Sequence, residues 1–180
     1  MNPIYWPIDD DAVVRTFTPD DAEELFALVE ANRDRLRPWM PWEATTLSPA
    51  DTRDFIERSL VSETHLDANG IWVGDELKGS IGLRVDLLHA SGEIGYWLDS
   101  GVVGRGLVTR ACKMFIDHGF RELGLHRITI HAAVQNVRSR AVPERLGFTQ
   151  EGVLRQADQV AGEYKDLVVY GLLEHEWPRE

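Results

Sequence analysis

The clearest pattern of apolar and polar positions lies between Gly92 and Lys113. Apolar or aromatic side chains stand at every second position, Ile94, Tyr96 and Leu98, a period of two that is typical of a strand with one buried face. A glycine-rich stretch follows, after which apolar residues recur at helical spacing: Leu107, Val108, Ala111, Cys112 and Phe115. The pattern therefore predicts a strand, a glycine turn and an amphipathic helix in direct succession.

Similar patterns predict the other elements. Two helix starts place a hydroxyl, a proline and an acid in series, Thr18-Pro19-Asp20-Asp21 and Ser48-Pro49-Ala50-Asp51. Alternation predicts strands over residues 11–17, 70–73, 77–85, 127–133, 147–154 and 165–173, a hairpin turn over 74–76, and a short helix over 137–146. Antiparallel strands followed by a β-α-β unit predict a mixed α/β sheet. Because the sequence shows no repeat or linker, we expect one domain over residues 1–180.

Composition narrows the functional classes. The formal net charge of −11 disfavours a nucleic-acid-binding surface, and it fits either a solvated surface or attraction of cationic substrates. No basic segment followed by an apolar run opens the sequence, and no stretch approaches the roughly 20 apolar residues of a membrane helix. The lone Cys112 lies on the apolar helix face, where we expect an inert buried thiol, and the six histidines show no metal-ligand spacing. We expect a cytoplasmic protein without a metal, a membrane or a nucleic-acid partner.

The glycine turn has the features of an anion site. The first N–H groups of a helix lack intrahelical partners, the helix dipole adds about half a positive charge, and glycines let a phosphate approach the backbone. Arg105 adds a cation. A nucleoside-triphosphate loop would carry a lysine and a hydroxyl after its last glycine, and a dinucleotide turn would read G-x-G-x-x-G; this sequence has neither. On these residues alone, a phosphate-binding turn and a plain connecting turn both remain open.

Three blocks of the chain resemble one enzyme family in order and spacing. The segment EIGYWLDSGVVGRGLVTRACKMFIDHGF resembles motif A of the GNAT N-acetyltransferases, in particular the branch that acetylates the N-terminal serine of ribosomal proteins. LRPWMPW upstream and NVRSRAVPERLGFTQEGVLRQA downstream resemble the same branch. The resemblance implies acetyl-CoA as cofactor, a mostly antiparallel mixed sheet splayed at its fourth strand and flanked by about four helices, and a homodimer.

The resemblance also places the diphosphate of acetyl-CoA in the glycine turn. The family pattern R/Q-x-x-G-x-G/A falls on six residues, Val103, Gly104, Arg105, Gly106, Leu107 and Val108. Val103 and Val108 depart from the usual side chains, but neither removes a backbone N–H that could bind phosphate. Further cofactor contacts are implied at Trp97, Leu98, Thr109, Asn136 and Ser139. Asn136 could equally end its strand in a local Asx turn.

Acetyl transfer from a thioester to an amine needs a donor to the carbonyl oxygen and a proton for the leaving thiolate. The resemblance implies the backbone N–H of Leu98 for the first role. It implies the Ser139 hydroxyl for the second, although capping of the short helix is an equally open reading. Pro143 stands where many GNATs have a proton-donating tyrosine, and because proline lacks an N–H it frees a helix carbonyl near Ser139.

The general base is expected to be a carboxylate. Asp158 matches a glutamate of the branch but is one methylene shorter, which favours a water relay; it could also be a loop carboxylate without a role. Glu93, on the predicted strand, is the competing base and a candidate acceptor contact. Trp39 and Trp42 are implied to wall the acceptor pocket, although they could instead pack on the core, and Tyr164 is a further implied acceptor contact.

Three functions remain open on this basis. The first is transfer of an acetyl group from acetyl-CoA to a protein N-terminus, directly in a ternary complex. The second is acetylation of a small amine, such as a polyamine or an aminoglycoside, which the charge of −11 would attract. The third is a non-catalytic acyl-CoA-binding module, because Val103, Pro143 and Asp158 depart from common patterns.

The turn assignment predicts that Gly104→Asp abolishes cofactor binding, since it places an anion where the diphosphate is expected. Titration calorimetry with acetyl-CoA measures the effect. Normal binding by this variant would show that the turn assignment is wrong.

Overall fold

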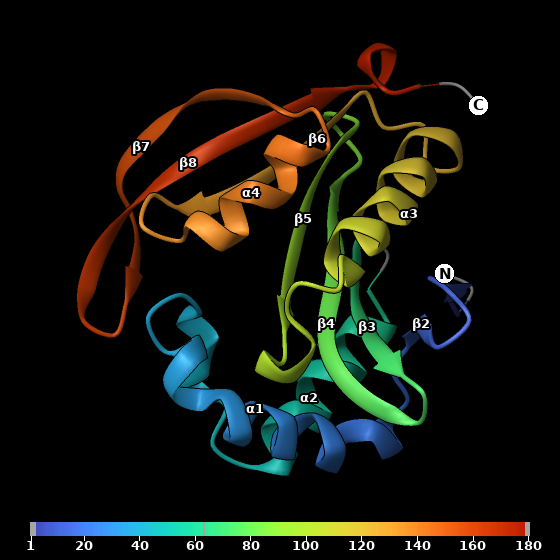
Figure 1. Cartoon of the computed structure of the whole chain (residues 1–180), viewed down its shortest axis with the longest axis vertical. Helices are drawn as coiled ribbons and strands as arrows, with labels where there is room; N and C mark the ends of the chain where they lie inside the picture. The colour runs from blue at the N-terminus through green and yellow to red at the C-terminus, as the bar shows by residue number, and fades with distance from the viewer. Residues whose placement is uncertain (1–2, 63, 179–180) are drawn as a thin grey trace.

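The computed structural model describes residues 3–62 and 64–178, and in these ranges it forms one sheet in the order β1-β2-β3-β4-β5-β6-β8-β7 (Figure 1). The strands are β1 (Tyr5–Pro7), β2 (Ala12–Thr16), β3 (His65–Val73), β4 (Glu76–Asp86), β5 (Ser91–Leu98), β6 (Arg127–Ala133), β7 (Thr149–Val160) and β8 (Glu163–Leu173). The helices are α1 (Ala22–Leu36), α2 (Pro49–Leu60), α3 (Leu107–Arg121) and α4 (Val137–Arg145). All pairings are antiparallel except that of β5 with β6.

Two apolar cores hold the helices to the sheet. One joins α1 and α2 to β3 and β4 through residues such as Val29, Ile56 and Trp72. The other lies under α3, which buries the face that its spacing predicts, including Phe115 against the strands. Figure 1 shows α1 and α2 together at the foot of the sheet, with α3 and α4 higher in the view. Burial of these apolar side chains is the main term that stabilises both layers.

The sheet opens between β5 and β6. β5 pairs with β4 along its whole length, but its parallel pairing with β6 covers only residues 91–93 (Figure 1). The Asp99 N–H donates to the Lys78 carbonyl at 2.6 Å, and because ladder bonds alternate in direction, the N–H and C=O of Tyr96 and Leu98 point away from β4. These backbone groups therefore face the gap that β6 leaves.

The predicted fold is confirmed: a mixed, mostly antiparallel sheet with helices on both sides, splayed at the predicted fourth strand. That strand is β5 in the structure because a short strand that the sequence did not suggest, β1, precedes the others. The hairpin turn between β3 and β4 and the β5-α3-β6 crossover also occur where predicted.

Three strands were predicted too short. β3 begins at His65 rather than residue 70, β8 begins at Glu163 rather than residue 165, and β7 continues beyond Leu154 to Val160. β7 is exposed on both faces over most of its length, so it has no apolar alternation to detect, and its register shifts between Leu154 and Asp158. Asp158 thus lies in a strand, paired with Lys165, and not in a loop.

Candidate active site

The glycine turn before α3 presents a row of backbone donors. Gly104 and Gly106 have φ angles of 90° and 73°, a region that glycine enters without the steric cost of a side chain. Within the described part of the chain, nothing accepts a hydrogen bond from the N–H groups of residues 103–109. A Cβ added to Gly104 would have no atom within 4 Å. Open space, free N–H groups and a helix N-terminus suit the diphosphate that the resemblance implies.

Some side chains of the turn are buried and anchor α3, and others are exposed to solvent. Leu107 is buried and Val108 is partly buried against the core, so both fix the start of α3, whereas Val103 is exposed. The Thr109 hydroxyl accepts a hydrogen bond from Arg145 at 2.9 Å, which ties the first turn of α3 to the end of α4.

Two arginines lie beside the turn in ion pairs with the segment between β1 and β2. Arg105 contacts Asp11 at 3.2 Å and Arg110 contacts Asp9 at 2.7 Å. The N–H of Asp11 is the main cause that lowers the pKa of Asp9, and the charges of Arg110 and Arg105 add to it. Both pairs are solvent-exposed, so the guanidinium groups can move to an anionic ligand at small cost.

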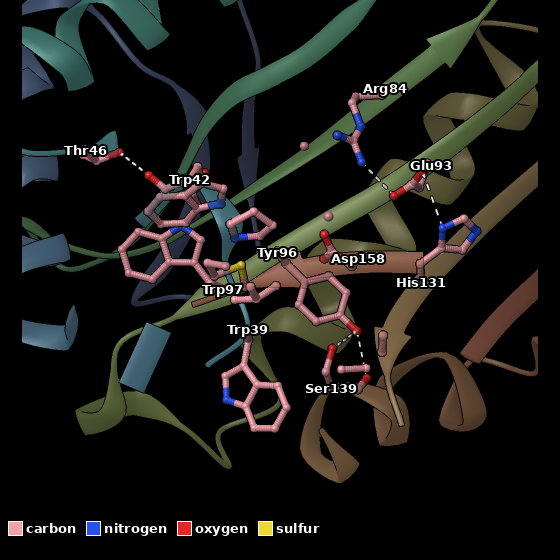
Figure 2. A pocket seen from close by; sticks show the side chains of 18 of the residues that line it. Trp39, Trp42, Thr46, Arg84, Glu93, Tyr96, Trp97, His131, Ser139 and Asp158 are labelled. Carbon is pink, nitrogen blue, oxygen red and sulfur yellow. Dashed lines mark hydrogen bonds and ion pairs between the residues drawn. The ribbon is translucent and has the colours of Figure 1, made fainter. Parts of the chain in front are cut away.

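Tyr96 links β5 to α4 across the gap in the sheet. Its hydroxyl donates to the Ser139 carbonyl at 2.9 Å, and the Ser139 hydroxyl donates to the Tyr96 oxygen at 3.4 Å (Figure 2). Pro143 stands four residues after Ser139 and has no N–H, so this carbonyl lacks its helical donor and Tyr96 supplies one. The sequence indicated a freed carbonyl here but did not indicate Tyr96 as its partner.

Asn136, not Ser139, caps α4. Its side-chain oxygen accepts from the Ser139 N–H at 3.2 Å, as expected of an N-cap residue. The capping alternative for the Ser139 hydroxyl is therefore not realised, and that hydroxyl lines the cavity described below. The expected contact of Asn136 with the cofactor stays a prediction.

The end of β5 is held from α1. Arg35 donates to the Leu98 carbonyl at 2.6 Å, so of the two Leu98 backbone groups facing the gap only the N–H has no partner among the described residues. The buried Asn32 side chain donates to Asp99 at 2.9 Å and accepts from the Ser100 N–H at 3.2 Å. Sequence reasoning did not find Arg35 or Asn32, because nothing in an amphipathic helix marks which polar side chains meet a distant backbone.

A cavity of about 940 Å³ lies on the α1–α2 side of the gap. Three predicted aromatic residues line it, Trp39, Trp42 and Trp97, with the rings of Trp42 and Trp97 centred 6.0 Å apart at 48° (Figure 2). Trp97 alternates with Tyr96 along β5, so its side chain faces this cavity rather than the core under α3.

The tryptophan-bearing segment between α1 and α2 is fixed by a buried ion pair. Arg33 contacts the Glu43 carboxylate at 2.7 Å and donates to the carbonyls of Glu43 and Thr46. The Glu43 side chain is only 5% exposed, so removing its partner would leave a buried charge. This wall of the cavity is therefore a rigid part of the fold.

The cavity also gathers the candidate bases. Glu93 contacts Arg84 at 2.7 Å and His131 at 3.8 Å, and Asp158 lies across the cavity on β7 beside Lys165 (Figure 2). Ser139 and Asp158, which are predicted from different motifs, line the same space. His131 was not among the predicted site residues. Its position on β6, the strand that leads to Asn136, is the sequence feature that could have identified it.

One of the predicted acceptor contacts lies outside this cavity, and two classes of feature are absent from the described residues. Tyr164 is 62% exposed on the β7–β8 hairpin and does not line the cavity, so its acceptor contact stays a prediction. No cluster of three or more metal-ligating side chains occurs among the described residues. Over the same ranges, none of the helices has the length and apolar character that a membrane crossing requires.

Comparison with known proteins identifies relatives over nearly the whole chain. A family model described as an acetyltransferase (GNAT) domain matches residues 12–149. "Putative ribosomal N-acetyltransferase YdaF" of Bacillus subtilis (strain 168) is 39% identical over 96% of this chain and 97% of its own. The ribosomal-protein-serine acetyltransferase of Escherichia coli (strain K12) is 32% identical over 81% of this chain and 83% of its own. The crystal structure of the microcin C7 self-immunity acetyltransferase MccE, in complex with acetyl-CoA and AMP, superposes with a TM-score of 0.86 at 29% identity and covers 92% of this chain and 94% of its own.

The Tyr96 environment predicts a pH-dependent stability. Burial is the main cause that raises the pKa of Tyr96 above its usual value of about 10, so the folded protein keeps this proton where the unfolded chain loses it. The contribution of Tyr96 to the free energy of unfolding should therefore be present below pH 10 and be lost above it, a fall of about 0.8 kcal/mol between pH 8 and about pH 10.5.

Urea unfolding at these two pH values, compared with Tyr96→Phe, isolates the effect because the raised pKa values of Tyr170 and Cys112 contribute equally to both proteins. Tyr5→Phe, at an exposed position, is the matched control. An equal fall in wild type and Tyr96→Phe would contradict the prediction.

Proposed function

The chain belongs to the GNAT acetyltransferase family and is an acetyl-CoA-dependent N-acetyltransferase, and we propose that its acceptor is the N-terminal amine of a protein, with ribosomal proteins as the first candidates. The names of the 39% and 32% identical relatives support this acceptor class. The observation that carries the proposal is the large cavity that both Ser139 and Asp158 line, walled by Trp39 and Trp42. Its volume suits several residues of a polypeptide better than one small amine.

The glycine turn and the gap in the sheet form the cofactor half of this proposal. Acetyl-CoA bound there supplies an acetyl group activated as a thioester. The N–H groups of residues 103–109 would hold the diphosphate, with Arg105 and Arg110 as the nearest cations. The Leu98 N–H, which faces the gap without a partner, would donate to the acetyl oxygen as negative charge develops on it.

Ser139 is the proposed proton donor to the thiolate. The thiol formed from the thiolate has a pKa of about 8.5, close to the ambient pH. A hydroxyl that is already hydrogen-bonded is therefore a sufficient proton donor. In the structure the Ser139 hydroxyl donates to the Tyr96 oxygen at 3.4 Å, so it must turn from Tyr96 to the thiolate, and solvent then returns the proton that Ser139 gives up. Tyr96 itself stays neutral throughout the working pH range, since its pKa is raised.

For the acceptor amine we propose Asp158 as the base, acting through a water, with Glu93 as the competing residue. Asp158 lines the cavity and has no ion-pair partner in the described part of the chain, whereas Glu93 is engaged by Arg84 and His131. An N-terminal amine has a pKa of about 8, against about 10.4 for lysine, so its deprotonation demands little of a carboxylate. This difference favours N-terminal over lysine acceptors.

A small cationic amine is the second candidate acceptor. The net charge of −11 would draw a polyamine or an aminoglycoside toward the enzyme. The charges inside the cavity are mixed, however, because three cations, Arg58, Arg84 and Lys165, line it together with His131 and four carboxylates, Asp51, Asp54, Glu93 and Asp158. A site built for a polycation would have a larger excess of carboxylates, so a peptide fits this lining better.

We further infer that residues 1–180 form one domain and that the enzyme works in the cytoplasm as a homodimer without nucleic acid. The two cores on either side of one sheet support a single domain. β7 supports the dimer because it is a long edge strand with Val153 and Leu154 each about half exposed. Protein N-termini of the proposed kind are made in the cytoplasm.

The acceptor class is tested by acetyl-CoA turnover with two panels, peptides that copy ribosomal-protein N-termini and small amines including polyamines and aminoglycosides. We expect mass spectrometry to find acetylation of peptide α-amines at kcat/KM at least tenfold above any small amine. A reversed preference would support the second candidate. Binding of acetyl-CoA without turnover on either panel would favour the non-catalytic alternative.

The proposed acid predicts that Ser139→Ala lowers kcat by about 10- to 100-fold, with less than a threefold change in acetyl-CoA affinity. The variant keeps the backbone groups that Asn136 and Tyr96 contact, so the fold of α4 should survive. Ser59→Ala on α2 is the matched control. Rates equal to wild type would remove Ser139 from the reaction.

A further inference from the structure

The floor of the acceptor cavity contains a stretch of sheet without side chains. Gly82 on β4 and Gly95 on β5 are directly opposite in the antiparallel register, and both line the cavity. Glycine within a strand loses more conformational entropy on folding than alanine, about 0.5–1 kcal/mol, and gives no packing in return. Two paired glycines at this place therefore call for an explanation.

Gly95 is not required by the fold itself. A Cβ added there would have no heavy atom within 4 Å, and its φ lies outside the left-handed region. Other strand glycines are different: a Cβ on Gly79 would lie 2.4 Å from the Trp97 carbonyl oxygen, and one on Gly92 would lie 2.7 Å from Leu83. Those two glycines serve internal packing, whereas the space above Gly95 is open and belongs to the cavity.

The cross-strand pairs on either side of Gly82 and Gly95, on the same face of the sheet, differ in chemistry. The next cross-strand pair with the same facing is Arg84 with Glu93, joined by an ion pair, and His131 lies beside it (Figure 2). The pair on the other side is Ser80 with Trp97, where Trp42 adds a second ring. The floor therefore runs from a charged end that offers both donors and acceptors to an aromatic end beside Leu98.

The position of Gly95 relative to the reacting groups sets what can lie above it. It precedes Leu98 by three residues, about 10 Å along a strand, and the Arg84–Glu93 pair is about 16 Å from Leu98. A reacting amine next to the Leu98 N–H cannot itself reach that far. An extended peptide advances about 3.4 Å per residue, so its fourth residue can lie above Gly95 and its fifth or sixth residue can reach the Arg84–Glu93 pair.

We propose that the main chain of the acceptor, just after its reacting N-terminus, passes over Gly95 at a distance that leaves no room for a methyl group. The Gly82–Gly95 pair is the floor that permits this approach, and the Arg84–Glu93 pair offers a donor and an acceptor to the acceptor's own polar groups beyond it. This inference rests on the proposed peptide acceptor. It makes Gly95 a specificity-determining position that favours polypeptide N-termini.

The test uses Gly95→Ala with two acceptors that share the same first residue: a six-residue peptide from the turnover panel and the amide of that first residue alone. Gly152→Ala on β7 is the matched control, because Gly152 is also a strand glycine with open space above it but lies outside the cavity. Thermal unfolding and acetyl-CoA titration calorimetry accompany the kinetics.

We expect Gly95→Ala to unfold at the same or a higher temperature and to bind acetyl-CoA as wild type does. Its kcat/KM for the six-residue peptide should fall at least tenfold, through KM, and at least five times more than for the amide. Gly152→Ala should stay within twofold of wild type with both acceptors.

A loss below threefold with the peptide, or an equal loss with the amide, would overturn this inference and leave the proposed function standing. If wild type acetylates small amines but no peptide, both proposals fail. If Gly95→Ala does not fold, the open space above Gly95 is wrong and the inference falls with it; Gly95→Ser repeats the test with a second small side chain.

Discussion

The structure depends on the point at which β5 and β6 stop sharing hydrogen bonds. Three residues of each strand pair in parallel, and beyond Glu93 and Thr129 the two strands separate. A sheet normally satisfies its backbone groups with neighbouring strands, so this separation leaves the polar groups of Tyr96 and Leu98 without a strand partner. Arg35 takes the Leu98 carbonyl, so the Leu98 N–H is the group of that residue still directed at the gap, beside the N–H and C=O of Tyr96. The cavity, the glycine turn and α4 are all arranged around that opening.

The contact between Tyr96 and Ser139 exists because a proline interrupts the hydrogen bonding of α4. Proline in the middle of a helix normally costs stability because a carbonyl loses its donor. In α4 that carbonyl belongs to Ser139, and the Tyr96 hydroxyl from the opposite side of the gap occupies it. The same hydroxyl accepts from Ser139, so the serine is held in place through both its backbone and its side chain. The two parts of the splayed sheet are thereby joined at the proposed reaction centre.

Elements that depend on a local pattern of apolar residues could be predicted from the sequence, whereas contacts between distant segments could not. The alternation at Ile94 and the helical spacing around Phe115 predicted β5 and α3 because each reflects burial of one face. Exposed β7 lacks such a pattern and was predicted too short, which misplaced Asp158 in a loop. Site residues carried by motifs, such as Ser139 and Asp158, line one cavity, while Arg35 is recognisable only once α1 and β5 are seen together.

The polar side chains of α1 have a practical consequence for protein engineering. Arg33 secures the tryptophan-bearing segment through Glu43 and Thr46, and two positions later Arg35 secures the end of β5. A chimaera that imports only the 39–46 loop from another enzyme would therefore separate the loop from its anchor and remove the Glu43 carboxylate that Arg33 holds. Residues 33–46 are the smallest segment that contains both the loop and its anchor. Retargeting such an enzyme to a new amine should therefore begin by exchanging this whole segment.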